Sequence, residues 1–295
     1  MELLKNIKKT YHHELDAIFG ADEVDSFFYL LIAHYFDISR LQLAIDLERS
    51  MTAEGARLMQ NALEQLKQEA PIQYIIGETE FFGLPFIVNE NVLIPRPETE
   101  ELVGLVLQSI NHQISNSNSQ ELHILDIGTG SGCIAVSLAK NLPNAKVYAL
   151  DVSKDALKIA KQNAMRNNVD IEFMAADILD ASCCAGLVSD SQKFDIIVSN
   201  PPYVRYQEQS QIKNNVLQNE PHLALFVDDT DALQFYRAIC EFSVDKLKHP
   251  GMLFFEINAY LGQEMKTLMA QYHFKTVELK QDLFGKDRMI KAIQS

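Results

Sequence analysis

The spacing of apolar residues divides the chain into two parts with different periodicities. Up to about residue 75 the apolar residues recur at helical spacing, which predicts amphipathic helices. Ser39 and Thr52 are expected to cap two of them, the first over Arg40–Leu47 and the second ending at Pro71. Residues 1–75 are therefore predicted to form a small helical bundle. The recurring positions include Leu3, Leu4, Ile7, Tyr11, Phe27, Leu30, Leu31 and Tyr35.

After Gly77 the pattern changes to short runs of aromatic and β-branched residues. Residues 80–88 contain two such runs around a turn, which is typical of a β-hairpin. Pro95 and Pro97 then stiffen a short segment, and a helix is expected to begin near Glu98. The polar run 111–120 predicts a loop. We expect residues 76–95 to link the helical domain to a second domain over residues 96–295.

From residue 122 onward, short apolar runs alternate with segments of helical periodicity. A helix over residues 153–165 with Ser153 as its cap is one example. Alternation of strands and helices predicts an α/β fold, with a doubly wound, mostly parallel sheet covered on both faces. The seven predicted strands are Leu122–Ile127, Lys146–Leu150, Ile171–Met174, Phe194–Ser199, Gly251–Ile257, Thr276–Leu279 and Arg288–Ile293.

The charge of the chain narrows the classes of partner. Of 295 residues 47% are apolar, enough for sizeable cores, and the net charge is −14. Residues 1–75 hold 7 Lys/Arg against 12 Asp/Glu, and residues 76–295 hold 19 against 28, so neither part is basic. A protein that neutralises many phosphates needs a basic excess, so we expect no direct nucleic-acid partner.

Cysteine usage and apolar run length favour a cytoplasmic protein. None of the four cysteines has C-x-x-C spacing, so reduced thiols are expected, with Cys183 and Cys184 in an irregular stretch before the fourth strand. The longest early apolar run, Phe27 to Phe36, is about half the length that crosses a bilayer. The histidines show no metal-ligand spacing. We expect a soluble, cytoplasmic monomer without a metal or a membrane partner.

A glycine-rich loop follows the first predicted strand, with the sequence Gly128-Thr129-Gly130-Ser131-Gly132. Glycines let backbone approach a ligand closely, and a strand-to-helix loop is where open α/β sheets bind nucleotides. A dinucleotide fingerprint would have glycine at Cys133, and a G-K-[S/T] sequence is missing as well. The next strand ends at Asp151, close to the offset of about 20 residues at which a carboxylate binds ribose hydroxyls. S-adenosylmethionine fits, because it has a ribose but no pyrophosphate; a purely structural turn is the alternative.

The third predicted strand is followed by Asp177 and Ile178. In such a site Asp177 would accept a hydrogen bond from the adenine amino group, and Ile178 would lie against the ring. An ordinary loop aspartate is the alternative.

The fourth predicted strand ends in Asn200-Pro201-Pro202-Tyr203. In doubly wound sheets strands one and four are neighbours, so this segment should lie beside the glycine loop. A turn that ends a strand would explain the two prolines but not the asparagine and tyrosine that flank them.

These residues suit methyl transfer to a nitrogen whose lone pair is delocalised, as in an amide or an exocyclic base amine. The side-chain oxygen of Asn200 and the carbonyl of Pro201 could accept both N–H bonds, and the prolines would fix that carbonyl. Tyr203 offers a flat face for a planar group. We predict Asn200, Pro201 and Tyr203 as catalytic residues, all four residues of the segment as substrate-binding, and Asn200 as a cofactor-binding residue as well.

The Asn-Pro-Pro-Tyr segment resembles the [D/N/S]-P-P-[Y/F/W] motif of amino-methyltransferases, which act on adenine N6, cytosine N4 or protein glutamine. Further segments resemble the PrmC/HemK family, the release-factor glutamine N5-methyltransferases. They are Gln73–Gly77, Phe81–Leu84, Leu93–Glu100, Glu220-Pro221 with Ala224-Leu225, and Asp282–Arg288.

The resemblance implies a Rossmann-like methyltransferase domain and a substrate, the glutamine of the Gly-Gly-Gln motif in peptide-chain release factors. It implies that Asn200–Tyr203 hold the glutamine amide, that Gly128–Gly132 and Asp151 hold S-adenosylmethionine, and that the helical domain helps engage the release factor. It also places Pro95, Arg96, Pro97 and Glu98 in the wall of the substrate site. The chain departs from the family at Val227–Thr230, where a glycine pair is usual, and at Asn258.

Two other functions remain open from the sequence. One is methylation of adenine N6 in DNA, which would require a target-recognition region and a basic face. The other is a non-catalytic cofactor-binding scaffold, which would not need an intact Asn-Pro-Pro-Tyr segment.

Overall fold

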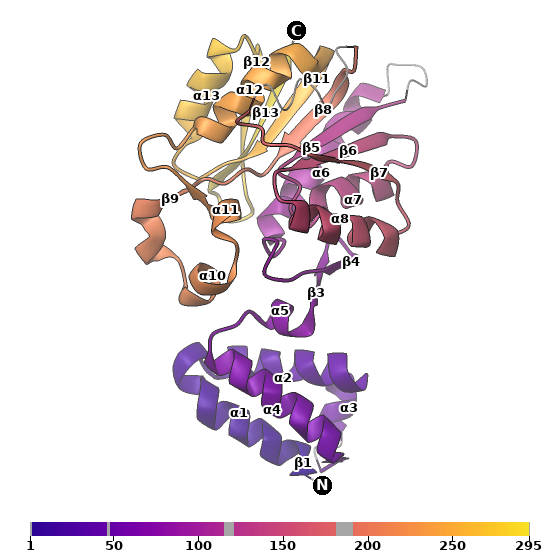
Figure 1. Ribbon diagram of the computed structural model, residues 1–295, viewed down its shortest axis with the longest axis vertical. Helices are drawn as coiled ribbons and strands as arrows, with labels where there is room; N and C mark the ends of the chain where they lie inside the picture. Colours follow the sequence, from indigo (N-terminus) through magenta and orange to yellow (C-terminus); the bar gives the residue numbers. More distant parts are fainter. Residues whose placement is uncertain (1, 46–47, 115–120, 181–190, 295) are drawn as a thin grey trace. The chain divides into compact units, whose positions relative to one another are not determined.

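The computed structural model describes residues 2–45, 48–114, 121–180 and 191–294 (Figure 1). The chain divides into two compact units. The first comprises Met1–Gly77 and Lys213–Asn219, and the second comprises Glu78–Ile212 and Glu220–Ser295.

The first unit is built from helices around an apolar core. Leu4, Leu15 and Phe28 are fully buried, and the buried hydroxyl of Tyr11 donates a hydrogen bond of 2.6 Å to the carbonyl of Met59. The predicted helical bundle is confirmed. Its elements are α1 (Leu4–Phe19), α2 (Ala21–Phe36), α3 (Arg40–Ile45), α4 (Ala53–Lys67), α5 (Ile72–Ile76), α10 (Asn214–Asn219) and the strand pair β1 (Glu2–Leu3) and β2 (Ser50–Met51).

The start of α4 was predicted correctly and its end was not. Thr52 caps the helix by accepting a hydrogen bond of 3.0 Å from the Gly55 N–H. The helix ends at Lys67 rather than at Pro71, because Glu69 adopts a left-handed conformation with a φ of 59° that a right-handed helix cannot continue. Nothing in the sequence indicated that α10 would belong to this unit; there the Asn219 amide donates to the Glu69 carbonyl at 3.2 Å.

The second unit begins with the predicted hairpin, formed by β3 (Glu78–Phe81) and β4 (Leu84–Ile87). Phe82 and Gly83 at its turn both have positive φ, the geometry that suits the twist of a two-residue hairpin. The Phe82 N–H donates to the Glu100 carboxylate at 2.7 Å, which fastens the turn to the first helix of this unit.

A seven-stranded sheet forms the centre of the second unit and confirms the predicted fold class. The strand order is β12-β13-β11-β8-β5-β6-β7, and β13 is antiparallel to both neighbours while the other pairs are parallel. Strands one and four of the prediction, β5 and β8, are neighbours, with Ile127 opposite Ser199. The strands are β5 (His123–Ile127), β6 (Lys146–Asp151), β7 (Ile171–Ala175), β8 (Phe194–Ser199), β11 (Leu247–Glu256), β12 (Thr276–Gln281) and β13 (Asp287–Gln294).

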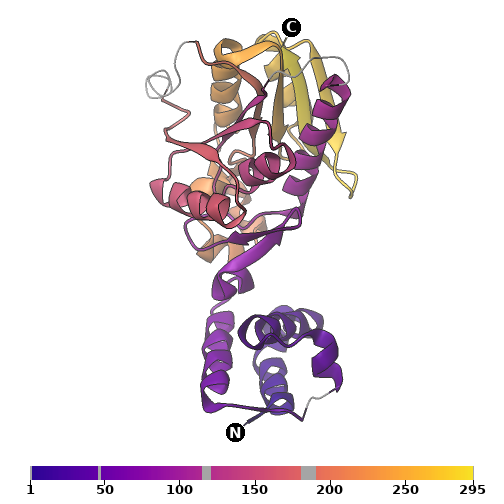
Figure 2. The same cartoon turned by 90° about the vertical axis from the view of Figure 1, so that its right-hand side faces the viewer.

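Helices cover both faces of this sheet, as Figures 1 and 2 show. Alternate residues of β5 point to opposite cores: Ile124 packs with α6 and α7, and Leu125 packs with α12 and α13. Parallel strands that are buried on both faces read as continuous apolar runs for this reason. The helices are α6 (Pro97–Ile114), α7 (Cys133–Asn141), α8 (Lys154–Arg166), α12 (Gln234–Lys246) and α13 (Gly262–Gln271).

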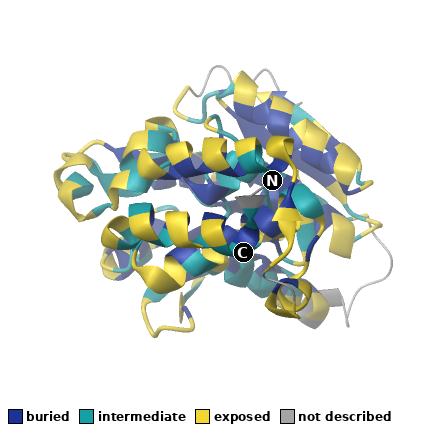
Figure 3. Cartoon of the chain, turned by 90° about the horizontal axis from the view of Figure 1, so that it is seen from below, coloured by how far each residue is buried: buried dark blue, intermediate teal, exposed yellow. Residues whose placement is uncertain are grey.

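Burial along α1, α4 and α8 follows the amphipathic pattern of the sequence, with buried and exposed residues on opposite sides, whereas α7 is buried from Cys133 to Ala139 (Figure 3). The loop predicted for residues 111–120 is wrong at its start. Helix α6 continues to Ile114, because its apolar stripe packs on the sheet as far as Ile110, so the last polar turn stays helical. The rest of that predicted loop, residues 115–120, lies outside the described residues.

Short elements complete the second unit: β9 (Val204–Arg205) pairs in parallel with β10 (Phe226–Val227), and η1 (Tyr206–Gln211) and α11 (His222–Leu225) lie between them in sequence. In the segment without the family's glycine pair, Asp228 closes the turn by accepting hydrogen bonds from the N–H and hydroxyl of Thr230 at 2.8 and 2.6 Å. A side-chain turn here takes the place of a glycine turn.

Cys133 and Cys240 are buried free thiols, and the stretch that holds Cys183 and Cys184 lies outside the described residues. None of the helices described is long and apolar enough to cross a membrane. Within the described part of the chain, histidine, cysteine and acidic side chains form no cluster that could hold a metal ion.

Candidate active site

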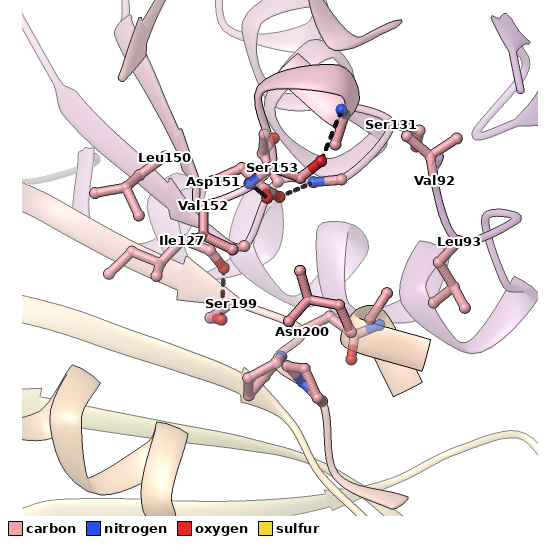
Figure 4. A pocket seen from close by; sticks show the side chains of 18 of the residues that line it. Val92, Leu93, Ile127, Ser131, Leu150, Asp151, Val152, Ser153, Ser199 and Asn200 are labelled. Atoms are coloured by element: carbon pink, nitrogen blue, oxygen red, sulfur yellow. Dashed lines mark hydrogen bonds between the residues drawn. The ribbon is translucent and has the colours of Figure 1, made fainter. Parts of the chain in front are cut away.

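A cavity opens at the carboxyl ends of the parallel strands, where open α/β sheets place their ligands. Its wall combines the glycine loop after β5, the ends of β6, β7 and β8, the segment before α6, and parts of α11 and α12 (Figure 4). In Figure 4, Ile127 and Leu150 lie on one side of this space and Val92 and Leu93 on the other.

The glycine loop adopts a backbone conformation that favours glycine. Gly128, Gly130 and Gly132 have φ angles of 74°, 55° and 81°, which side chains disfavour. The N–H groups of Gly128 and Thr129 both donate to the Leu150 carbonyl, at 2.8 and 3.0 Å, so the loop is tied to the end of β6. A Cβ on Gly132 would lie 3.1 Å from the Cβ of Ala160, so glycine also permits close packing of α7 against α8.

Asp151, at the end of β6, braces this loop. One carboxylate oxygen accepts from the Gly130 N–H and the other from the Ser153 N–H, each at 2.8 Å (Figure 4). Burial raises the pKa of Asp151, and the backbone donors oppose that shift. A carboxylate offers about four acceptor positions, so roughly two remain for ligand hydroxyls. The same side chain can therefore hold the loop and a ribose.

Asp126, at the base of the loop, was not singled out from the sequence. It is fully buried and accepts a hydrogen bond of 2.6 Å from the Thr129 hydroxyl. Burial raises its pKa to about 7. Its bond to Thr129 holds the loop in place. Its position two residues before the first glycine is the signal that could have identified it.

Asp177 and Ile178 also line the cavity. The Asp177 carboxylate accepts from the Leu179 N–H at 2.9 Å, and the half-buried Ile178 packs on the adjoining core. The described residues of the wall include one cation, Arg96, and it is paired with Glu220. Among the described residues, this wall has acidic side chains and no unpaired cation. Its charge therefore suits a ligand with a sulfonium group better than a ligand with phosphate groups.

Asn163 of α8 connects the hairpin to the glycine loop. Its amide oxygen accepts from the Ile87 N–H at 2.6 Å, and its nitrogen donates to the carbonyls of Ile87 and Ser131 at 3.0 and 2.9 Å. The buried amide thus uses both its ends on backbone groups. These bonds hold the end of β4, and the cavity-lining residues Asn91–Leu93 follow it.

Asn200 lies at the end of β8 and lines the same cavity as the glycine loop. Just before it, the Ser199 hydroxyl donates to the Ile127 carbonyl at 2.6 Å, which fixes the two strand ends together (Figure 4). The Asn200 side-chain nitrogen donates to the hydroxyl oxygen of Thr99 at 3.2 Å. No donor among the described residues is bonded to the amide oxygen of Asn200, which leaves it as an acceptor for a ligand. Pro201 and Pro202 also line the cavity.

Tyr203 follows the two prolines, and its hydroxyl contacts a buried carboxylate. It is not among the described residues that line this cavity; its half-buried ring packs on the core, and its hydroxyl donates to Glu256 at 3.0 Å. Burial raises the pKa of Tyr203 far above its usual value, so the hydroxyl keeps its proton. A stacking role for this ring stays a prediction.

Thr99 and Glu256 were not predicted as site residues, yet hydrogen bonds connect them to Asn200. Glu256 ends β11, is fully buried, and accepts from the Thr99 hydroxyl at 2.7 Å as well as from Tyr203. Burial raises the pKa of Glu256, while these two donors and the charge of Arg288 favour its ionised form. An acidic residue at the end of an apolar strand is the signal that could have found it.

Of the four residues predicted to form the wall of the substrate site, two line the cavity. Pro95 and Arg96 line it, while Pro97 and Glu98 are not among the described lining residues. The Arg96 guanidinium donates to buried Glu220 at 2.5 Å, and the other oxygen of Glu220 accepts from the Ile94 N–H at 3.2 Å. Pro97 instead begins α6, where its missing N–H costs nothing.

Solved structures of methyltransferases share this fold. A methyltransferase from Pyrococcus furiosus is 18% identical, with a TM-score of 0.51, over 79% of this chain and 98% of that one. The human methyltransferase 10 domain containing protein is 19% identical, also with a TM-score of 0.51, over 72% of this chain and 89% of that one. At these identities the likeness concerns the fold.

Sequence comparison is more specific. The family model described as PrmC N-terminal domain matches residues 13–77, and the Methyltransferase small domain matches residues 105–224. The release factor glutamine methyltransferase of Flavobacterium psychrophilum is 51% identical over 98% of this chain and 99% of its own length. The protein of the same name from Bacteroides thetaiotaomicron is 39% identical over 98% and 99%. The chain belongs to the release factor glutamine methyltransferase family.

Proposed function

We propose that this protein transfers a methyl group from S-adenosylmethionine to the side-chain nitrogen, N5, of the glutamine in the Gly-Gly-Gln motif of a peptide-chain release factor. The observation that carries the proposal is the orientation of Asn200. Its nitrogen is bonded to Thr99, and its oxygen stays available in a cavity that also contains the glycine loop and Asp151.

The cofactor side of the cavity would hold S-adenosylmethionine through backbone and carboxylate. Asp151 would accept hydrogen bonds from the ribose hydroxyls, and Gly128–Gly132 would allow close approach of the methionine part. Asp177 and Ile178 would contact the adenine. When bound, S-adenosylmethionine supplies an electrophilic methyl group on a positively charged sulfur.

The substrate side must prepare a weak nucleophile. The lone pair of an amide nitrogen is delocalised into its carbonyl, so the nitrogen attacks only when held in line with the methyl carbon. The oxygen of Asn200 and the carbonyl of Pro201 would each accept one N–H of the substrate amide and favour positive charge growing on the nitrogen. Preorganisation of this kind contributes several kcal/mol, on the order of a hundredfold or more in rate.

The proton balance needs no strong base. As the new N–C bond forms, the bond between the methyl carbon and the sulfonium sulfur breaks, and its electron pair stays on sulfur as a neutral thioether. The positive charge passes to the amide nitrogen, which then releases one N–H proton to water and becomes a neutral methylamide. Tyr203 keeps its own proton because its pKa is raised, so we assign it to orientation rather than to proton removal.

The two domains predicted from the sequence would have different roles. Residues 96–295 would carry the chemistry, and residues 1–75 would help engage the release factor through protein contacts. Release factor is thus the proposed partner, and a monomer acting in the cytoplasm remains our expectation.

Mass spectrometry tests the proposed reaction directly. Purified enzyme is incubated with full-length release factor and S-adenosylmethionine, and the digest is searched for one added methyl group on the Gly-Gly-Gln peptide. A release factor with glutamate in place of that glutamine is the matched control, because it has the same shape without the reactive nitrogen. Methyl on duplex DNA but not on release factor would reject the proposal in favour of an adenine methyltransferase.

A further inference from the structure

Three side chains from distant parts of the chain form a directed series of hydrogen bonds behind the substrate site. Asn200 donates to Thr99 at 3.2 Å, and Thr99 donates to Glu256 at 2.7 Å. They come from the end of β8, the first turn of α6 and the end of β11. Thr99 and Glu256 are almost completely buried, with exposed fractions of 2% and 1%, so water does not compete for these bonds.

The direction of this series follows from counting protons. A threonine hydroxyl has one proton and can donate once. An ionised carboxylate can only accept, so the Thr99 proton must point to Glu256. The oxygen of Thr99 can then only accept, and the group that faces it from Asn200 must be the NH₂ end of the amide. A reversed Asn200 would place its oxygen against the Thr99 oxygen.

We propose that Glu256 is a positioning residue for methyl transfer, because its acceptance of the Thr99 proton forces Asn200 to present its oxygen to the substrate. The inference rests on the proposed function, in which the substrate group at Asn200 is an NH₂ group that needs an acceptor. Glu256 touches neither substrate nor cofactor in this scheme; it acts through Thr99.

Burial raises the pKa of Glu256, and the hydrogen bonds around it favour its role as an acceptor. Its second oxygen accepts from the Tyr203 hydroxyl at 3.0 Å, so both oxygens face donors. The guanidinium of Arg288, which also lies near the Ile257 carbonyl, adds a positive charge that favours the carboxylate. Two donors and a nearby cation offset part of the cost of burying the charge.

An exchange of chemical groups between positions 200 and 256 tests this directly. In Asn200→Asp, oxygen faces Thr99 whichever way the side chain turns, and a second negative charge lies near Glu256. We expect a loss of at least about 100-fold in kcat on release factor, as for the loss of a preorganised polar group. Adding Glu256→Gln supplies an NH₂ donor to Thr99, whose proton is then free to point to the carboxylate introduced at position 200. The double variant has the composition of the wild type with amide and carboxylate exchanged.

We expect Glu256→Gln to raise the kcat of the Asn200→Asp enzyme by at least about 10-fold. If the two substitutions acted independently, their effects would be additive in free energy and the second would give no gain. Cofactor affinity, measured by calorimetry, should stay within about 3-fold of wild type in all variants, because none of these groups holds the cofactor in this scheme. A purely structural Glu256 would predict a further loss instead of a gain.

Variants at Thr99 distinguish two explanations of the expected gain in kcat. One is transmission through the Thr99 hydrogen bonds, and the other is relief of charge repulsion between positions 200 and 256. In a Thr99→Val background the hydroxyl is gone while the side-chain shape is kept, so Glu256→Gln should no longer raise the kcat of Asn200→Asp. Thr99→Ser keeps the hydroxyl and should keep the rescue. Alone, Thr99→Val should lower kcat about 10-fold without weakening cofactor binding, and Thr99→Ser should change it less than about 3-fold.

The possible results distinguish failure of the proposed role of Glu256 from failure of the proposed function. Wild-type enzyme that methylates release factor, together with an Asn200→Asp enzyme that Glu256→Gln does not improve, overturns the role of Glu256 and leaves the proposed function intact. Rescue that persists in the Thr99→Val background also overturns it, because charge alone would then explain the gain. A wild-type enzyme without activity on release factor rejects the proposed function and this inference with it. The Thr99 variants, which differ from wild type by small buried groups, keep the test decisive if a variant at 256 does not fold.

Discussion

The two sides of the cavity, to which we assign the cofactor and the substrate, are built in different ways. On the cofactor side, backbone N–H groups of the glycine loop donate to the Leu150 carbonyl and to the Asp151 carboxylate, both in the next βα unit. On the substrate side, Asn200 is oriented by Thr99 and Glu256, which lie 101 and 56 positions away in the sequence. The first side depends on local backbone conformation, and the second depends on side chains that only the complete sheet brings together.

This difference has a functional reason. A cofactor with several polar groups can be held by many backbone contacts, each of modest strength, so the loop mainly needs the right shape. A single planar amide must be held at one orientation, and that requires side-chain acceptors whose own polarity is fixed. We therefore expect substitutions on the two sides to separate cleanly into effects on cofactor affinity and effects on turnover.

The largest effect is expected from Asn200→Ala. It removes the oriented acceptor and should lower kcat on release factor about 100- to 1000-fold, the usual range for a preorganised polar group. Steady-state kinetics with labelled cofactor measures the loss, and calorimetry should find cofactor affinity nearly unchanged. Asn144→Ala, in the exposed turn before β6, is the matched control and should be silent.

Asp151→Asn should produce the reverse pattern. The carboxamide has one acceptor atom in place of two, so its NH₂ group would face the N–H of either Gly130 or Ser153. We expect the dissociation constant for S-adenosylmethionine to rise about 10- to 100-fold, equivalent to roughly 1.4 to 2.7 kcal/mol, with a smaller change in kcat at saturation. Asp155→Asn, an exposed position on α8, is the control. If Asn200→Ala lost as much cofactor affinity as Asp151→Asn, the two sides would not differ in function as proposed.

Gly132→Ala tests how much the close packing of α7 on α8, at the end of the glycine loop, contributes to stability. The new Cβ would meet Ala160 at 3.1 Å, at a φ of 81° that alanine disfavours. We expect a loss of about 2 kcal/mol or more in the free energy of unfolding, from backbone strain and overpacking together. Gly285→Ala has a similar φ of 75° with open space around it, so it should cost less, and denaturant unfolding gives the difference due to packing. Equal losses in both variants would mean that close packing of α7 on α8 contributes nothing.

The smallest expected effect is a pH dependence from Asp126. Burial raises its pKa to about 7 in the folded chain, above the value of about 3.9 for an exposed aspartate. Between these values the folded state binds more protons than the unfolded state, so this contribution to stability is complete below about pH 4 and is lost as pH rises through 7. Asp126→Asn cannot titrate and should lack this component.

Unfolding in urea at pH 5 and pH 8, with wild type and Asp126→Asn in parallel, measures that component. We expect the wild type to lose on the order of 1–2 kcal/mol more than the variant between the two pH values. A variant with the same pH dependence as wild type would show that Asp126 does not titrate in this window.

Sequence reasoning succeeded where a feature is encoded by neighbouring residues. The seven strands, the caps of α4 and α8, the hairpin and the place of the glycine loop after β5 all follow from periodicity or from single residue types. It failed at the ends of α4 and α6, where packing and one left-handed residue decided the boundary. It did not foresee that the Tyr203 hydroxyl bonds to Glu256, and the stacking role of the ring stays a prediction.

By itself the sequence determined the fold class, the position of the glycine loop after β5, and the neighbouring place of Asn200 after β8. These follow because alternation of apolar residues and the winding rule for parallel sheets leave few arrangements. Only the tertiary structure decided which end of the Asn200 amide faces the cavity. That choice depends on the Thr99 hydroxyl and the Glu256 carboxylate, and a hydrogen bond between residues 157 positions apart exists only once the strands are in register.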